Sequence, residues 1–272
     1  MLLQDKLQQY SSEGKAILAT NFYNFETLSG VLQASKAKNS PIILQLSESS
    51  IDYMGLEIAT KMARAALKTY GVEGWLHLDH GSSVALIQRC LDAGFDSVMI
   101  DASEKSFEEN IKITSQVIKI ASCYRANVEA ELGFIAKLGQ TQLAKYTQPD
   151  EAKQFVEATG INALAIAVGT AHGFYKETPK LQLELIGSIH AATKAALVLH
   201  GGSGVPSDQL QGAIRQGISK INLATEIKNI FMKTLQQILS ETDEIDLRKV
   251  FPKATKSVVE LVGEKLDVIN LK

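Results

Sequence analysis

Cysteine, net charge and long apolar runs are all scarce in this chain of 272 residues, and each absence excludes a class of protein. The two cysteines, Cys90 and Cys123, are too few for a disulfide framework and are not spaced as a CxxC pair, which fits a reducing compartment. We expect both to be small buried side chains. A formal net charge of −2 gives no electrostatic attraction to nucleic acid or to an anionic membrane. Small molecules are therefore the expected partners.

No segment has the pattern of a targeting signal or a membrane span. The N-terminal stretch MLLQDKLQQY carries an acid at Asp5, and no later apolar run is long enough to cross a bilayer. We therefore expect a cytoplasmic protein. No linker rich in proline, glycine or serine divides the chain. The sequence thus predicts one domain over residues 1–272, with a C-terminal helical extension at 224–272.

Short apolar, β-branched runs alternate with amphipathic helical stretches along the whole chain. The runs predict eight strands, at residues 16–20, 41–46, 75–79, 97–101, 126–132, 162–168, 195–200 and 218–223. Between them, helical patterns cover 51–71, ending at Gly71, and 106–122, opening on a Ser106-x-x-Glu109 capping box. Eight βα units in a chain of about 250 residues close into a (β/α)8 TIM barrel. The alternative, an open doubly wound α/β sheet, lacks its GxGxxG sequence after the first strand.

The carboxyl ends of the predicted strands are all polar, and this is where a barrel of this type carries its catalytic groups. One polar end could be a helix cap or a loop residue, but eight together predict a site. In chain order the ends carry Asn21, then Gln45 and Ser47, Asp79 and His80, Asp101, Glu129 and Glu131, His172 and Gly173, HGGSG at 200–204, and Asn222 and Thr225.

Three of the five histidines lie at these ends, and a glycine follows each directly: His80, His172 and His200. Glycine lets a ligand or metal approach the backbone closely. Three neutral imidazoles from separate strands suit a catalytic zinc, which takes three protein ligands and keeps one position open. Asp101 and Glu131 could orient the imidazoles or hold a second cation. We interpret His77 and His190 as packed or surface histidines.

Two loops of small residues follow the last two strands, GGSG at 201–204 and NLAT at 222–225. Barrels often bind phosphate at this position, through backbone N–H groups and a helix N-terminus. Either loop alone could also be a simple turn. Beside a metal site, the two together indicate a phosphorylated substrate.

Six stretches of the chain resemble class II, zinc-dependent fructose-bisphosphate and tagatose-bisphosphate aldolases. They are LDHG (78–81), GFDSVMIDAS (94–103), NVEAELG (127–133), VGTAHGFYKETPKL (168–181), LVLHGGSGVP (197–206) and KINLATEIK (220–228). The resemblance covers nearly the whole chain in order. The tagatose-type members are the most similar, because they share an Asn-x-Ala-Thr-Glu stretch after the eighth strand.

The resemblance implies a role for each matching residue. The zinc ligands would be His80, His172 and His200. Asp79 would be the proton donor, and Asp101 with Glu131 would form a second or alternative position for a divalent or monovalent cation. Dihydroxyacetone phosphate would bind at Gly173, Gly201, Gly202, Ser203, Asn222, Leu223, Ala224 and Thr225. Asn21 and Ser47 would contact the substrate, and Arg248 would hold the second phosphate.

The implied reaction is reversible cleavage of a ketose 1,6-bisphosphate, fructose or tagatose, into dihydroxyacetone phosphate and glyceraldehyde 3-phosphate. Asp79 would take the C4 hydroxyl proton during cleavage, and its place next to His80 fixes the acid relative to the metal. The enzyme would be a homodimer or homotetramer. Two alternatives are a sibling aldolase for another phosphorylated sugar and a non-catalytic partner subunit that keeps the barrel.

One departure from the family bears on the chemistry. Relatives carry, after the glycine of the fifth strand, a loop acid that removes a proton from dihydroxyacetone phosphate. No acid lies between Gly133 and Asp150, where Lys137, Lys145 and Tyr146 occur instead. The chain also ends in DVINLK and not in the glycine-serine-alanine tail of its relatives. The departure requires another base, another substrate, or the non-catalytic role.

Overall fold

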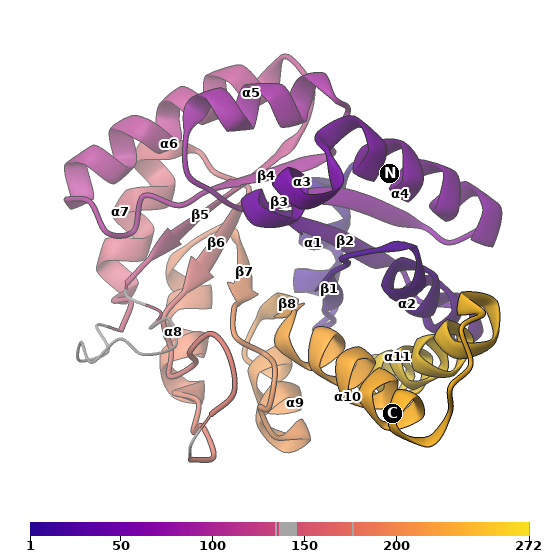
Figure 1. Cartoon of the computed structure of the whole chain (residues 1–272). Coiled ribbons are helices and arrows are strands. Elements are labelled where there is room, and N and C mark those ends of the chain that lie inside the picture. Colours follow the sequence, from indigo (N-terminus) through magenta and orange to yellow (C-terminus); the bar gives the residue numbers. More distant parts are fainter. Residues whose placement is uncertain (134, 136–145, 176, 272) are drawn as a thin grey trace.

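A computed structural model describes residues 1–133, 135, 146–175 and 177–271 of the chain (Figure 1). Eight parallel strands, hydrogen-bonded in chain order, form a closed barrel. They are β1 (Ile17–Asn21), β2 (Ile42–Ser47), β3 (Gly74–Gly81), β4 (Ser97–Ile100), β5 (Asn127–Leu132), β6 (Ala163–Ile166), β7 (Ala196–Leu199) and β8 (Ile218–Leu223). The predicted TIM barrel is confirmed, and the open doubly wound sheet is excluded.

Helices lie around the outside of this barrel (Figure 1). They are α1 (Leu3–Ser12), α2 (Phe25–Lys38), α3 (Glu48–Met54), α4 (Leu56–Tyr70), α5 (Val84–Asp92), α6 (Phe107–Ser122), α7 (Pro149–Thr159), α8 (Leu183–Ala192), α9 (Ser207–Arg215), α10 (Thr225–Glu241) and α11 (Leu247–Ile269). No described helix is both long enough and apolar enough to cross a membrane.

The helix expected over 51–71 is in fact two helices. Gly55 has a φ of 82° and separates α3 from α4, so the chain changes direction there. The end of the second helix is as predicted, because Gly71 caps α4 with a left-handed φ of 67°. At the start of α6, the Ser106 hydroxyl accepts a hydrogen bond from the backbone N–H of Glu109 at 3.2 Å.

The barrel has two apolar layers and one polar end. Outward-facing strand residues such as Leu44 and Leu197 pack against the helices. Inside the barrel, at the amino ends of the strands, a second cluster including Ile43 and Trp75 is closed by Leu7 of α1. Toward the carboxyl ends of the strands, the inward-facing residues become polar, as the sequence predicted.

The two cysteines differ in environment. Cys90 is buried on α5, as expected, but Cys123 is exposed, and the expectation for it was wrong. Cys123 follows α6, whose buried face runs through Asn110, Thr114, Val117 and Ala121. A residue two positions beyond Ala121 lies off that face, since side chains three or four positions apart share one side of a helix.

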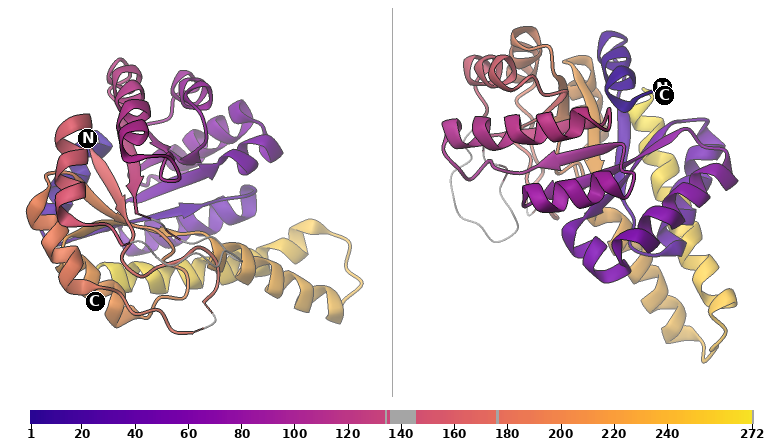
Figure 2. Two further views of the ribbon diagram at one scale, coloured as in Figure 1. Left: turned by 90° about the vertical axis from the view of Figure 1, so that its left-hand side faces the viewer. Right: turned by 90° about the horizontal axis from the view of Figure 1, so that it is seen from above.

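The last two helices form a hairpin that projects beyond the barrel (Figure 2). Its second helix, α11, returns along α2, and Lys38 of α2 pairs with Asp267 of α11. Gly30 of α2 allows this close packing, because a Cβ at that position would lie 2.8 Å from the Cβ of Val258.

Candidate metal centre and active site

A β-bulge in β3 brings two successive residues, Asp79 and His80, into one site. In a regular strand they would point to opposite faces. The pairing of β3 with β4 gains one extra residue between Leu78 and Gly81, and His80 takes a left-handed φ of 54°. Glycine is required next, because a Cβ at Gly81 would lie 2.7 Å from the carbonyl oxygen of Met99. The bulge therefore turns His80 toward the mouth of the barrel, in a conformation that costs energy for a non-glycine residue.

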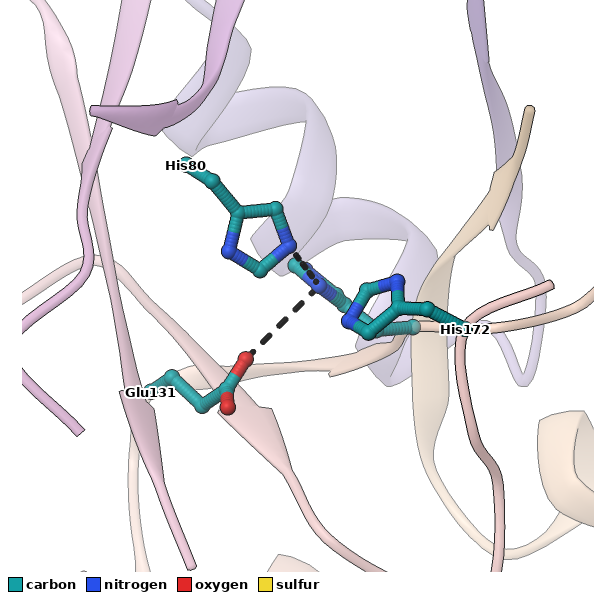
Figure 3. Close-up of side chains that lie close together, drawn as sticks. His80, Glu131 and His172 are labelled. Atoms are coloured by element: carbon teal, nitrogen blue, oxygen red, sulfur yellow. Dashed lines mark hydrogen bonds and ion pairs between the residues drawn. The ribbon is translucent and has the colours of Figure 1, made fainter. Parts of the chain in front are cut away.

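Four side chains from four segments of the barrel end converge on one point. The donor atoms of His80, Glu131, His172 and His200 all lie within 4.8 Å of one another. Figure 3 shows His80, Glu131 and His172 pointing toward one another. The ring centroid of His80 is 5.0 Å from that of His172 and 4.8 Å from that of His200. We call these four residues the donor cluster.

The hydrogen bond from His80 to Asp101 leaves Nε2, the other ring nitrogen, facing the donor cluster. Its Nδ1 lies 2.8 Å from Oδ2 of Asp101, a carboxylate that can only accept, so Nδ1 carries the proton. Asp101 is held in turn by Ser103, whose hydroxyl donates to Oδ1 at 2.7 Å. Burial opposes protonation of His80, but Asp101 and the nearby Asp79 and Glu131 raise its pKa to about 9. Asp101 thus lies behind His80 and outside the donor cluster.

His200 is oriented in the same way from the other side of the cluster. Its Nε2 lies 2.9 Å from Oε1 of Glu129, so this nitrogen carries the proton and Nδ1 faces the cluster. Nδ1 is 3.0 Å from Nε2 of His80. With Nε2 of His80 protonated, this contact is a hydrogen bond that His80 donates to Nδ1 of His200. A bound metal would take the place of that proton. Tetrahedral zinc, with Zn–N bonds of about 2.0–2.1 Å, places its ligand nitrogens about 3.3 Å apart.

Glu131 adds an oxygen that lacks a partner. Its Oε2 is buried without a hydrogen-bond partner among the described residues, 3.8 Å from Nδ1 of His200. Burial, with the charges of Asp101 and Glu129, raises the pKa of Glu131 to about 8, although the nearby His80 acts the other way. A bound cation would satisfy this oxygen and favour the carboxylate. The donor cluster therefore fits a divalent metal such as zinc.

Asp79 lies beside the donor cluster and does not belong to it. Nδ2 of Asn21 donates to Oδ2 of Asp79 at 3.0 Å, and Nδ2 of Asn222 lies 3.4 Å from Oδ1. Burial would raise the pKa of Asp79, but His80, His200 and the hydrogen bond from Asn21 hold it at about 2. Asp79 is therefore a carboxylate, ready to accept a proton.

A cleft next to Asp79 contains most of the residues expected to bind substrate. It is lined by Asn21, Asp79, His172, Gly173, Gly201, Ser203, Asn222, Ala224 and Thr225. The backbone is tightly packed at Gly201, where φ is 67° and a Cβ would lie 2.3 Å from the carbonyl oxygen of Ala171. Thr225 begins α10, so the N-terminus of that helix opens onto the cleft. This is the arrangement that favours a phosphate.

Three residues of the expected substrate site lie differently. The N–H of Gly202 already donates to the carbonyl of Asn222 at 3.0 Å, and the Leu223 side chain packs in the core outside the barrel. Ser47 caps α3, where its hydroxyl accepts from the N–H of Ser50 at 3.3 Å. It is nevertheless close to the site, because its Cα pairs with that of Asp79.

Arg248 is not brought to this cleft. Its side chain is 89% exposed at the start of α11 and forms two 3.0 Å contacts with the carboxylate of Asp246. It lines a separate groove of about 530 Å³ between α2 and α11, together with Phe25 and Phe251. This groove shares no lining residue with the cleft next to Asp79, so Arg248, on the projecting hairpin, lies outside that cleft.

Residues 134 and 136–145, where the sequence lacks the expected loop acid, lie outside the described residues.

The sequence analysis assigned no role to Glu129 and Lys220, and it interpreted His77 only as a packed or surface histidine. All three are completely buried inside the barrel. The period-2 alternation of side chains along a strand could have indicated this position, because it places Lys220 on the same face of β8 as the predicted site residue Asn222.

Comparison with known proteins agrees with this geometry. The family model described as fructose-bisphosphate aldolase class-II matches residues 2–272. The chain is 38% identical over 271 residues to the fructose-bisphosphate aldolase of Staphylococcus epidermidis, covering 97% of this chain and 95% of that protein. It is 40% identical over 237 residues to that of Geobacillus stearothermophilus, covering 85% and 83%.

A solved structure shows the same architecture. The crystal structure of the YdjI aldolase from Escherichia coli K12 superimposes with a TM-score of 0.87 at 31% identity, covering 98% of this chain and 96% of that one. The family match spans the barrel, the donor cluster and the hairpin, so the chain belongs to the class II fructose-bisphosphate aldolases, a family of carbon–carbon lyases.

Proposed function

We propose that the protein reversibly cleaves a ketose 1,6-bisphosphate, fructose or tagatose, into dihydroxyacetone phosphate and glyceraldehyde 3-phosphate. One observation carries the proposal: the donor cluster lies beside an ionised Asp79 and a cleft that ends at a helix N-terminus. A metal, a proton acceptor and a phosphate site are the three parts that this reaction needs.

Asp79 performs the proton transfer that starts cleavage. As a carboxylate it accepts the proton of the C4 hydroxyl, and in condensation it returns that proton to the aldehyde oxygen. Asn21 and Asn222 hold both of its oxygens, which keeps the carboxylate aimed along one direction. A zinc ion held by His80, His172 and His200 would supply Lewis-acid stabilisation of the negative charge left on the triose.

The substrate phosphate next to that triose binds in the cleft. Gly173, Gly201 and Ser203 line it, together with Ala224 and Thr225 at the start of α10. The first backbone N–H groups of a helix have no partner within it and would donate to a phosphate at this end of α10, although that of Glu226 already donates to the Ser203 hydroxyl at 3.3 Å. Asp101 and Glu131 are the groups proposed for a second or alternative cation, with Asp101 acting through His80.

The proton exchanged with solvent needs another base, since the loop between Gly133 and Asp150 has no acid. Glu131 is our first candidate, because its carboxylate lies in the donor cluster. A carboxylate from a neighbouring subunit is the second. Either base must come within hydrogen-bond reach of the bound triose, as proton abstraction requires.

The proposed enzyme is a cytoplasmic homodimer or homotetramer. Arg248 remains the proposed ligand of the second phosphate. Because it lies exposed on the projecting hairpin, we propose that it serves the site of a neighbouring copy.

An assay of purified protein against fructose and tagatose 1,6-bisphosphates tests the proposal. Cleavage of at least one sugar should disappear after chelation and return with zinc or cobalt. Activity that survives thorough chelation, or a lysine Schiff base trapped by borohydride, would exclude the metal mechanism. Zinc binding without cleavage of either sugar would instead support a sibling aldolase or the non-catalytic partner subunit.

A further inference from the structure

A chain of buried polar side chains lies below the donor cluster, inside the barrel. Lys220 of β8, Glu129 of β5 and His77 of β3 are all fully buried. Nζ of Lys220 lies 2.6 Å from Oε2 of Glu129 and 3.3 Å from Nε2 of His77. Nδ1 of His77 in turn lies 2.6 Å from the hydroxyl of Ser97. We call Glu129, Lys220 and His77 the interior triad.

The interior triad joins the donor cluster through one hydrogen bond. Oε1 of Glu129 accepts from Nε2 of His200 at 2.9 Å, while Oε2 of the same carboxylate accepts from Lys220. Each oxygen of Glu129 thus has its own partner, so the carboxylate cannot rotate without losing both bonds. His77 accepts from Lys220 through Nε2, which leaves the Nδ1 proton to bond Ser97.

The need to fill the barrel interior does not explain why the charged pair of Glu129 and Lys220 is buried there. The layer below it is filled by apolar side chains, among them Ile43, Trp75 and Val198. Burying an ammonium and a carboxylate costs more than such a filling, and well-packed apolar residues often replace a buried ion pair without loss of stability. The pair is therefore more easily explained by what it does to His200.

We propose that Glu129 is a positioning residue for the metal centre, and that Lys220 and His77 hold it in place. Glu129 keeps the His200 proton on Nε2, so that the Nδ1 lone pair always faces the other donors. The same bond fixes the plane of the imidazole. Its loss would let the proton move to Nδ1, where it competes directly with the metal. The inference rests on the proposed zinc site, but its test does not depend on the reaction.

Two charge-balanced double variants separate this role from a role in stability. Glu129→Gln with Lys220→Met removes both charges but keeps an acceptor oxygen, and Glu129→Leu with Lys220→Met removes the acceptor as well. Zinc affinity of the metal-free full chain is measured by competition with a chromophoric chelator. It should fall by about 10–100-fold in the Gln variant and further in the Leu variant, the range seen when such partners of metal ligands are lost.

The surface pair Glu57 and Lys61 provides the matched control. These side chains lie 3.1 Å apart on α4 and are about four-fifths exposed. Glu57→Gln with Lys61→Met makes the same chemical change far from the interior triad, and should leave zinc affinity unchanged. Thermal unfolding of each metal-free variant shows whether affinity falls while the fold remains intact.

A second measurement reads the tautomer itself. Nitrogen NMR of the histidines in the metal-free protein should show the His200 proton on Nε2 in the natural chain and a shift toward Nδ1 in the Gln variant. Folded Gln and Leu variants with the zinc affinity of the natural chain would overturn the proposal, whatever the sugar assay shows. An unchanged tautomer in the Gln variant would overturn it as well, even if the Leu variant does not fold.

Discussion

Asp79 and His80 are neighbours in the chain, but we propose different tasks for them. The bulge aims both into one mouth, but only His80 belongs to the donor cluster, while Asp79 is held by asparagines. We therefore expect Asp79→Ala to lower turnover by about 100-fold or more, the usual contribution of a general acid–base group, with zinc content unchanged. Steady-state kinetics and metal analysis of the same preparation check this.

The control for that variant is His200→Ala, which removes a proposed ligand. It should lose zinc and activity together. If Asp79→Ala also loses zinc in proportion to activity, Asp79 supports the metal and the role in proton transfer is wrong.

The two thiols should differ sharply in reactivity. Burial raises the pKa of the Cys90 thiol to about 12, so at pH 8 it is both protonated and shielded. Cys123 is exposed. A chromogenic disulfide reagent should label one thiol in the native protein and two after unfolding in urea, with Cys123→Ser abolishing the fast native reaction. Rapid labelling of Cys90 in that variant would mean that α5 opens readily.

At the residue scale, position at a strand end predicted much of the site. His80, His172, His200 and Asp79 could be proposed from the sequence because the carboxyl ends of barrel strands meet at one mouth. The Glu129–Lys220 pair could not, since a lysine in an apolar strand resembles an edge or surface residue until the barrel closes. Likewise, no sequence pattern predicts the φ of 54° at His80.

At the level of helices, the packing of α2 on α11 can be tested by comparing two glycines that lie within helices, Gly30 of α2 and Gly187 of α8. A Cβ at Gly30 would meet the Cβ of Val258 at 2.8 Å and the carbonyl of Thr255 at 3.1 Å. A Cβ at Gly187 would meet only the tip of the flexible Gln216 side chain. Gly30→Ala should therefore destabilise the protein by about 1–3 kcal/mol, as overpacking does.

The same substitution at Gly187 should be neutral or stabilising by up to about 1 kcal/mol, because alanine favours the helix. Urea unfolding of both variants against the natural chain measures the difference. Equal effects at the two positions would show that the α2–α11 contact yields easily and that the hairpin is loosely held.

The positions of the strands were easier to predict than the point at which a helix is interrupted. All eight strands appear where alternation and β-branched runs predicted them, each within two residues at both ends. The helix predicted over 51–71 breaks at Gly55, because a glycine inside a helical pattern can be either tolerated or used for a turn. Tertiary packing decides whether such a glycine continues the helix or turns the chain, and the sequence pattern does not contain that information.

At the scale of the whole molecule, the hairpin places Arg248 in a groove that shares no residue with the cleft next to Asp79. If Arg248 serves a neighbouring copy, two defective variants should complement each other. Asp79→Ala keeps the arginine but lacks the proton acceptor, and Arg248→Ala keeps the proton acceptor but lacks the arginine. Arg248→Ala alone should raise KM for the bisphosphate, since a phosphate contact is lost.

Mixing the two variants under conditions that exchange subunits should then restore activity, to roughly a quarter of the natural level if a dimer pairs at random. Half of such dimers are hybrids, and each hybrid has one site with both Asp79 and the partner copy's arginine. Native mass spectrometry of the mixture, with one variant isotopically labelled, confirms that hybrids formed. No gain on mixing, with exchange demonstrated, would exclude a role for Arg248 in the site of a neighbouring copy. An unchanged KM in Arg248→Ala would then leave the second phosphate to another cation, whereas a raised KM would assign Arg248 to the site of its own chain.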